Sequence, residues 1–445
     1  MKKVWILYLS MVSLQVTAQN TWDVQKCMQY AVEHNHEVNK LELQLDNHKA
    51  EKKGAVGSFL PSVGVSIGGQ YNFGRAIDPE TNTYTNVNTF YNGYQIYASL
   101  PVFDGFNRLH ALQAAKASVL MGQSALRQQQ DQTALAVLQA YIDVVYYKGT
   151  IEMAEEKQEE TTLLLKQTRL LEEVGRKSAA DVAQVESQQA EAVYDLTRQQ
   201  NLYETALMEL KKEMGVAPLS SPEGDTFDIA TPSFSEYSAP QGEVPSGGVE
   251  GAEIEVLRFQ ADAARHEWHQ ARSALYPSIS LNLGMNTTYY KTLHSPTASS
   301  FGDQFRNNRG EYIGATLSIP IFNRLQTITS IRKAKNNYKM ACEEYEQKQL
   351  ELEKLSREAW QDWQCYLKQI EQMMHKVEVD SIAYQLTRRQ FEEGLSTAID
   401  LRSSSAQLLN SKATLLQCKL MAMVKRQLVR YYRGECIWGP IPTSH

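Results

Sequence analysis

The sequence contains two copies of one pattern, and this duplication restricts the possible folds more than any other feature. Residues separated by 219 positions match without a gap over more than a hundred residues. Upstream the separation becomes 216, because the loops that precede Pro101 and Pro320 differ by three residues. Long helices can share Ala or Glu by chance, but paired Pro, Gly, Asp and aromatic positions in one frame indicate a repeat. Matched pairs include Pro101/Pro320, Phe103/Phe322, Tyr147/Tyr366, Gly175/Gly394, Asp181/Asp400 and Gly215/Gly434.

Each copy predicts the same order of elements. A helix is followed by two short strands around a polar loop, then by a very long helix, a short turn and a second helix. We expect the two structural repeats at 19–215 and 252–434. The segment 216–251 is rich in Pro, Ser and Gly and predicts an irregular insert, and the tail 435–445 is similar in character.

The first 18 residues have the composition of a secretory signal peptide. Lys2 and Lys3 precede an apolar stretch from Val4 to Val16, and small residues follow near Ala18. That stretch is too short for a membrane span, and no later run of about 18 apolar residues predicts a transmembrane helix. We therefore expect an exported protein that is cleaved near Ala18.

Four segments alternate between apolar and polar residues. In the first, Val63, Val65 and Ile67 fall on one face, and Ser62 and Ser66 fall on the other. The other three segments carry Tyr94, Ile96, Ala98 and Leu100; Ile279, Leu281, Leu283 and Met285; and Ile313, Ala315, Leu317 and Ile319. This period is typical of transmembrane barrel strands, and equally of a half-buried sheet in a soluble domain. Aromatic residues at the strand ends, where a membrane girdle would lie, are Tyr71, Phe73, Tyr91, Tyr94, Tyr289, Tyr290 and Tyr312.

If these strands cross a membrane, one chain is not enough to close them. Open strand edges cannot face lipid, because their N–H and C=O groups find no partner there. About eight strands are the practical minimum for closure. Several chains must therefore pool their strands, and two copies would give eight strands while three would give twelve.

The helical segments are too long for a globular protein. No proline occurs between Gly105 and Gly175, and good helix formers dominate. About 68 helical residues would span roughly 100 Å, and the second copy, from about Thr327 to Glu393, is equally long. Such lengths indicate a coiled-coil or tube-like assembly, since globular helices average about 11–12 residues.

Short matched turns interrupt the helices, VGRKSAAD at Val174–Asp181 and EGLSTAID at Glu393–Asp400. Gly175 and Gly394 can stop the incoming helix in a left-handed conformation. Ser178 and Thr397 are placed to cap the outgoing helix. The sequence therefore predicts two long helical hairpins.

The ordered set of motifs resembles the TolC-like outer membrane efflux proteins over nearly all of the mature chain. The matching segments are CMQYAVEHN in the first helix, FLPSV and LYPSI at strand openings, LPVF and SIPIF at strand exits, and the tips LEEVGRKSAADV and QFEEGLSTAIDL. The implied fold class is mainly α with a small β part, a channel-tunnel protomer with four transmembrane β-strands and long antiparallel helical hairpins, internally duplicated.

The resemblance implies a homotrimer in outer-membrane lipid with a long periplasmic extension. It also implies a periplasmic adaptor and an inner-membrane pump of RND or ABC type as partners, and passive passage of cargo. In this family the tip turns dock the adaptor, which here assigns that role to Gly175, Ser178, Gly394, Leu395 and Ser396. Many members carry an arginine where this chain has Ser396, so the salt bridge that closes the tunnel in this family must differ here. Arg176, Lys177 and Arg402 are the residues that could replace the missing arginine.

The resemblance also places Asp181 and Asp400 at the periplasmic aperture. Six carboxylates from three chains would disfavour anions and could bind a divalent cation. The alternative is that both are ordinary first-turn aspartates, favoured by the helix dipole.

Other classes of function have little support in the sequence. A net charge of −6 and a pI near 5.9 argue against a nucleic-acid partner. No phosphate-binding loop, dinucleotide fingerprint, nucleophile elbow or metal-ligand spacing occurs, so we expect no enzyme, no cofactor and no metal. His266, Glu267 and His269 lack a metal-binding spacing. The remaining alternative is an extracytoplasmic coiled-coil adaptor or scaffold without a pore, which leaves the four alternating segments unexplained.

Overall fold

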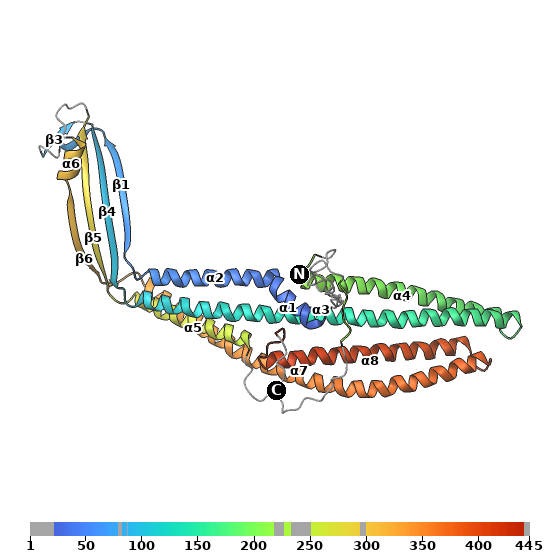
Figure 1. Ribbon diagram of the computed structural model, residues 1–445. Helices are drawn as coiled ribbons and strands as arrows, with labels where there is room; N and C mark the ends of the chain where they lie inside the picture. The colour runs from blue at the N-terminus through green and yellow to red at the C-terminus, as the bar shows by residue number, and fades with distance from the viewer. Residues whose placement is uncertain are drawn as a thin grey trace, which may run out of the picture. The chain divides into compact units, whose positions relative to one another are not determined.

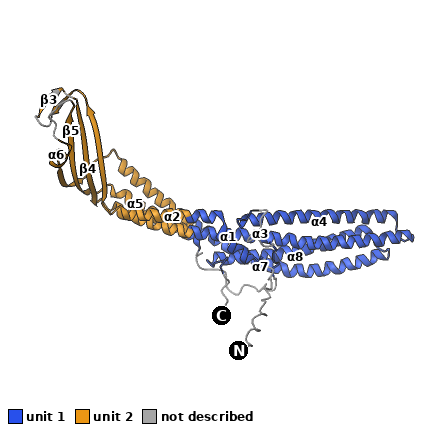
Figure 2. Cartoon of the chain, turned by 45° about the horizontal axis from the view of Figure 1, so that its top comes forward, with its two compact units in different colours: residues 1–42, 125–254, 348–445 blue, residues 43–124, 255–347 orange. Residues whose placement is uncertain are grey.

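The structure is a computed structural model that describes residues 22–78, 82–86, 88–217, 227–232, 251–293 and 300–439. The predicted signal peptide and most of the predicted insert lie outside the described residues. The chain forms two units (Figure 2). One comprises residues 1–42, 125–254 and 348–445, and the other comprises 43–124 and 255–347.

The second unit contains a four-stranded antiparallel sheet (Figure 1). Its strands are β1 (Ser62–Asn72), β4 (Thr89–Phe103), β5 (Ser278–Thr292) and β6 (Gly310–Ser318), in the order β1-β4-β5-β6. The predicted alternating segments are thus strands. Because β4 pairs with β5, the centre of the sheet joins the first sequence copy to the second, and β1 and β6 form its two edges.

The register gives the sheet two chemically different faces. Val65 pairs with Ile96, and Ile96 pairs with Met285, so these side chains share one face, which we name the apolar face. Val65 is 66% exposed and Ile313, on the same face, is 72% exposed. The tyrosines at the strand ends are divided between the two faces. Tyr71, Tyr94 and Tyr289 lie on the apolar face, but Tyr91, Tyr290 and Tyr312 lie on the opposite, polar face, because the register gives them the other parity.

Both connecting loops contain elements that their polar composition did not predict. The first holds the hairpin of β2 (Arg75–Asp78) and β3 (Thr83–Asn86). The second holds α6 (Phe301–Asn307), whose N-cap Ser300 accepts a hydrogen bond from the Asp303 N–H. The α6 helix packs its phenylalanines against the apolar face of the sheet, where Phe305 lies 5.3 Å from Tyr94 and Phe301 lies 5.2 Å from Tyr289 between ring centroids.

Four helices form two hairpins that repeat each other. The first pairs α3 (Asn107–Glu173) with α4 (Ala179–Glu213), and the second pairs α7 (Gln326–Glu392) with α8 (Ala398–Tyr432). The long helices have 67 residues each and the return helices have 35 each. Corresponding helices begin 219 residues apart (326 − 107 and 398 − 179). The duplicated hairpin fold predicted from the sequence is therefore confirmed.

The predicted first helix is two helices. α1 (Val24–His34) ends at Asn35, which has extended backbone angles, and α2 (His36–Gly57) follows. The Asn35 side chain accepts from the Glu37 N–H and donates to the Glu213 carbonyl oxygen, 3.2 Å away. Asparagine competes in this way with helical hydrogen bonding, which explains the break. In the second copy the corresponding helix is α5 (Ala252–Ser273).

The core of the first unit contains residues from segments expected to be irregular. Ile229 of the insert and Ile437 of the tail are fully buried in one cluster with Trp22 and with Tyr141 of α3. The Tyr141 hydroxyl donates to the carbonyl oxygens of Trp22 and Ala230, and Trp22 bridges to Ile229 through the backbone. The described parts of the insert and the tail therefore help to fix this unit. Among the described helices, none has a stretch apolar enough and long enough to cross a bilayer.

Candidate functional site: hairpin turns and the seam between hairpins

Each hairpin turn is built on one glycine. Gly175 and Gly394 have φ values of +73° and +81°, in the left-handed region that glycine accepts without strain. The amides that follow bond back into the ended helix, from Arg176 to the Leu171 carbonyl oxygen at 2.8 Å and from Leu395 to that of Gln390 at 2.7 Å. The predicted helix stops are confirmed, and their geometry is that of a Schellman motif.

Asp181 and Asp400 each complete a capping box. The Asp181 N–H donates to Ser178 Oγ at 3.2 Å, and the Asp181 carboxylate accepts from the Ser178 N–H at 3.1 Å. Asp400 and Thr397 repeat these two bonds at 3.2 and 3.1 Å, respectively. The predicted caps Ser178 and Thr397 are confirmed, and both aspartates have the first-turn role considered for them.

These hydrogen bonds keep both carboxylates ionised. The backbone and side-chain bonds from Ser178 lower the pKa of Asp181 below 3.8, and the bonds from the Thr397 side chain and backbone lower the pKa of Asp400. A lowered folded-state pKa stabilises the fold fully above the ordinary value, and the stabilisation is lost as pH falls through the lowered pKa. The turns should therefore behave identically from pH 8 to pH 5 and loosen only below about pH 4.

We expect Ser178→Ala to loosen the start of α4. The substitution leaves an N-terminal amide without its acceptor, which costs about 1 kcal/mol. Hydrogen exchange of the first-turn amides should accelerate about fivefold, while amides near Glu213 keep their rates. Ser187→Ala, an exposed serine within the same helix, is the control and should change nothing. Equal acceleration in both variants would contradict the capping account.

Of the two residues proposed from sequence beside the second turn, Leu395 is exposed and Ser396 is partly buried. The Leu395 side chain is 76% exposed, and Ser396 Oγ donates to the Asp400 carboxylate at 3.3 Å. Two of the three basic residues named as replacements for the family's arginine have partners. Arg402 of α8 forms an ion pair with Glu191 of α4 at 2.9 Å, and Lys177 Nζ lies 3.8 Å from the ring centroid of Phe391.

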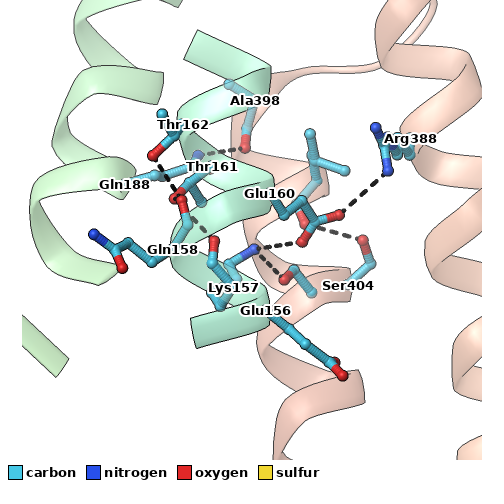
Figure 3. Close-up of polar contacts among 12 residues, drawn as sticks. Glu156, Lys157, Gln158, Glu160, Thr161, Thr162, Gln188, Arg388, Ala398 and Ser404 are labelled. Atoms are coloured by element: carbon cyan, nitrogen blue, oxygen red, sulfur yellow. Dashed lines mark hydrogen bonds and ion pairs between the residues drawn. The ribbon is translucent and has the colours of Figure 1, made fainter. Parts of the chain in front are cut away.

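A network of polar contacts joins the two hairpins of one protomer, and we name it the seam (Figure 3). Glu160 and Lys157 belong to α3, and Arg388 belongs to α7. The Glu160 carboxylate lies between the two cations, at an N–O distance of 3.5 Å from each. Lys157 also donates to Ser405 of α8. Further links run from Lys412 to Glu156, from Arg402 to Glu191, and from the Gln188 amide to the Ala398 carbonyl oxygen at 3.0 Å.

Lys157 is the most enclosed cation of the seam, with a side chain 20% exposed. Burial lowers its pKa, and the neighbouring Glu160 opposes that change. Its ammonium lies 6.0 Å from the ring centroid of Tyr384 on α7. Since α7 and α8 provide its ring and hydroxyl partners, Lys157 ties the first hairpin to both helices of the second.

Sequence reasoning missed the seam, although the repeat contains a signal for it. Lys157 and Lys376 are 219 residues apart and are therefore equivalent. Lys376 also bonds a serine of α8, Ser411, at 2.8 Å, and pairs with the buried Asp380 at 2.5 Å. Read singly, each lysine resembles an ordinary helix-surface residue that pairs three or four positions along its own helix.

The histidines near the end of α5 form no metal site. His110 stacks on His269 with ring centroids 5.2 Å apart, and burial lowers the pKa of His269 and of His266. No cluster of three or more metal-ligating side chains occurs in the described residues. All five cysteines are free thiols, with Cys27 and Cys418 buried.

An antiparallel sheet with an exposed apolar face and two repeated helical hairpins are the elements of an outer-membrane channel protomer with a long periplasmic extension. The chain belongs to the family of outer membrane efflux proteins, whose model matches residues 27–216 and 251–427. It serves as an outer-membrane exit duct for efflux or secretion, and the pore-free scaffold is not favoured.

Individual relatives agree with this assignment. The outer membrane efflux protein BepC of Brucella suis biovar 1 (strain 1330) is 23% identical over 358 residues, which cover 79% of this chain and 73% of that protein. Among solved structures, CusC superposes with a TM-score of 0.80 at 17% identity, covering 93% of this chain and 92% of that one. The CmeC outer membrane channel of Campylobacter jejuni gives 0.78 at 15% identity, covering 93% and 86%. At these identities the structures support the fold alone.

Proposed function

We propose that three copies of this chain assemble into one passive duct. The observation that carries this is the sheet: the outer edges of β1 and β6 have no partner among the described strands of the protomer, and its apolar face is exposed. Pairing β6 of one copy with β1 of the next satisfies both edges and closes a sheet of twelve strands around a lumen. The apolar face then contacts outer-membrane lipid, and the polar face lines the pore.

The proposed duct works with two partners. The exposed turns at Gly175, Ser178, Gly394, Leu395 and Ser396 provide a surface for a periplasmic adaptor, and the adaptor connects the duct to an inner-membrane pump of RND or ABC type. Residues 19–215 and 252–434 are proposed as the structural repeats, 216–251 and 435–445 as a belt around the helices, and 1–18 as the signal peptide.

Assembly is tested by fractionation and single-channel recording. The protein should sediment with outer membranes, resist extraction with salt, and migrate as a trimer in sodium dodecyl sulfate before heating. Purified trimers should conduct in planar bilayers. A protein that salt extracts, and that does not conduct, would instead be a periplasmic scaffold.

We propose that Asp181 and Asp400 line the periplasmic aperture. The double substitution Asp181→Asn and Asp400→Asn retains an oxygen acceptor for each cap but removes six charges from the trimer, so preference for cations over anions should fall severalfold. The reversal potential in a salt gradient measures this preference. Glu204→Gln, an exposed residue farther along α4, is the matched neutralisation. An unchanged reversal potential in the double variant would reject the aperture role.

A further inference from the structure

The polar face of the sheet carries no charge. Along the paired registers this face holds only serine, threonine, asparagine, glutamine, glycine and tyrosine, with Pro101 at one end of β4. Such a surface offers hydrogen bonds but neither attracts nor repels ions strongly.

One row across this face alternates glycine with tyrosine. Gly64 pairs with Tyr97, Tyr97 with Gly284, and Gly284 with Tyr312, so all four strands contribute one residue to what we name the tyrosine row. The phenol end of each ring lies over a glycine. A Cβ at position 64 would be 2.5 Å from Tyr97 Cζ, and one at position 284 would be 2.5 Å from the Tyr312 ring.

The two rings remain accessible where they lie. Tyr97 is 42% exposed and Tyr312 is 44% exposed. Each ring therefore covers a glycine with one end and leaves part of its surface open. Glycine permits this close approach, because a side chain in its place would displace the ring.

A hollow of about 330 Å³ adjoins the row. Its lining includes Ser66, Gly68, Gln95, Asn286 and Thr288. An added Cβ at Gly68 would meet no atom within 4 Å, so the space beside it is open. Gln95 Nε2 donates to the Tyr312 hydroxyl at 3.2 Å, which connects the hollow to the tyrosine row.

We propose that the tyrosine row and its hollow form a cargo subsite for uncharged aromatic molecules that carry hydroxyl or amide groups. Exposed rings offer apolar and aromatic contacts to an aromatic cargo, and the amide and hydroxyl side chains exchange hydrogen bonds with its polar groups. A charged cargo would give up hydration here without meeting an opposite charge. Rings and hydrogen-bonding groups without charge therefore complement a neutral amphiphile.

This inference rests on the proposed function, because the polar face becomes a pore wall only when copies pool their strands. Three copies would then place six tyrosines and six glycines in one ring around the lumen. The subsite would hold cargo weakly and repeatedly, which suits a passive duct whose ligand must leave as readily as it enters.

Chloramphenicol, a neutral nitroaromatic with an amide and hydroxyls, is the probe. Added to single trimers in planar bilayers, it should cause brief, concentration-dependent interruptions of the current. The double substitution Tyr97→Ser and Tyr312→Ser should raise the half-blocking concentration at least about fivefold. Tyr97→Phe with Tyr312→Phe keeps the rings and should retain most of the block. Tyr71→Ser, on the apolar face, is the matched control and should behave as the native protein does.

The possible outcomes are distinct. If no trimer conducts, the proposed function has failed, and the subsite fails with it. If trimers conduct but chloramphenicol does not interrupt the current, or if the serine and phenylalanine variants are blocked equally, the subsite is wrong and the duct stands. Block by maltose with none by chloramphenicol would also overturn the aromatic assignment.

Discussion

Replacement of Val65 with arginine is expected to abolish assembly of the channel in the outer membrane. Val65 lies on the apolar face of β1 and is 66% exposed in the protomer. An arginine that faces lipid costs about 2–4 kcal/mol near the bilayer midplane, and three copies would each add that cost. The effect is measured as the amount of heat-sensitive trimer in isolated outer membranes. We expect less than about a tenth of the native amount of trimer, because a cost of about 1.4 kcal/mol already lowers an equilibrium constant tenfold.

The neighbouring residue supplies the control. Ser66→Arg adds the same side chain on the opposite face, where water would fill the pore. Trimers should form in near-native amounts, and the ion selectivity of the channel should shift toward anions. Similar loss of trimers in both variants would mean that arginine in β1 is harmful on either face, and the assignment of lipid and water to the two faces would be rejected.

Replacement of Lys157 with glutamate is expected to separate the hairpins at the seam. The new carboxylate would lie beside Glu160 in a site where the native side chain is 20% exposed, and the bond to Ser405 would lose its ammonium donor. The hydrogen bond from Lys157 to Ser405 joins α3 to α8. Losing a hydrogen bond to a charged group costs about 1.5–3 kcal/mol, which corresponds to a roughly 10- to 100-fold shift between joined and separated hairpins. If contact between hairpins keeps the periplasmic end narrow, the resting conductance of single trimers should rise.

Two further variants make this test specific. Lys166→Glu makes the same charge change at an exposed position on the same helix and should leave the conductance unchanged. Lys157→Gln removes the ammonium without adding a carboxylate beside Glu160, and it should raise the conductance less than Lys157→Glu does. If Lys157→Glu and Lys166→Glu raise the conductance equally, loss of the seam contacts is not the cause.

Most of the fold could be predicted from the sequence because the duplication tests each expectation twice. Gly175 and Gly394 stop their helices and Ser178 and Thr397 cap the next ones, since glycine angles and cap hydrogen bonds are decided locally. The strands were recognisable for the same reason, because alternation depends only on which neighbours face the same way.

The features that were missed depend on contacts between segments distant in sequence. The break at Asn35 involves Glu213, the packing of α6 depends on Tyr94 and Tyr289, and the faces of the tyrosines follow from strand register. The seam is the clearest case, because Lys157 and Ser405 are 248 residues apart. No local pattern indicates which polar helix residues will meet across two hairpins.

Cysteine cross-linking between the sheet edges tests the central claim most directly. The five native cysteines are first removed. Each variant then carries one cysteine in β1 and one in β6, and a set of variants samples several possible registers between the two strands. Each variant is oxidised in intact outer membranes. The account predicts that at least one register yields covalent dimers and trimers under denaturing conditions, while pairs placed across β4 and β5 yield only cross-linked monomers. If every β1–β6 register left the chain monomeric while the β4–β5 controls oxidised fully, the copies would not pool their strands and the proposed duct would be wrong.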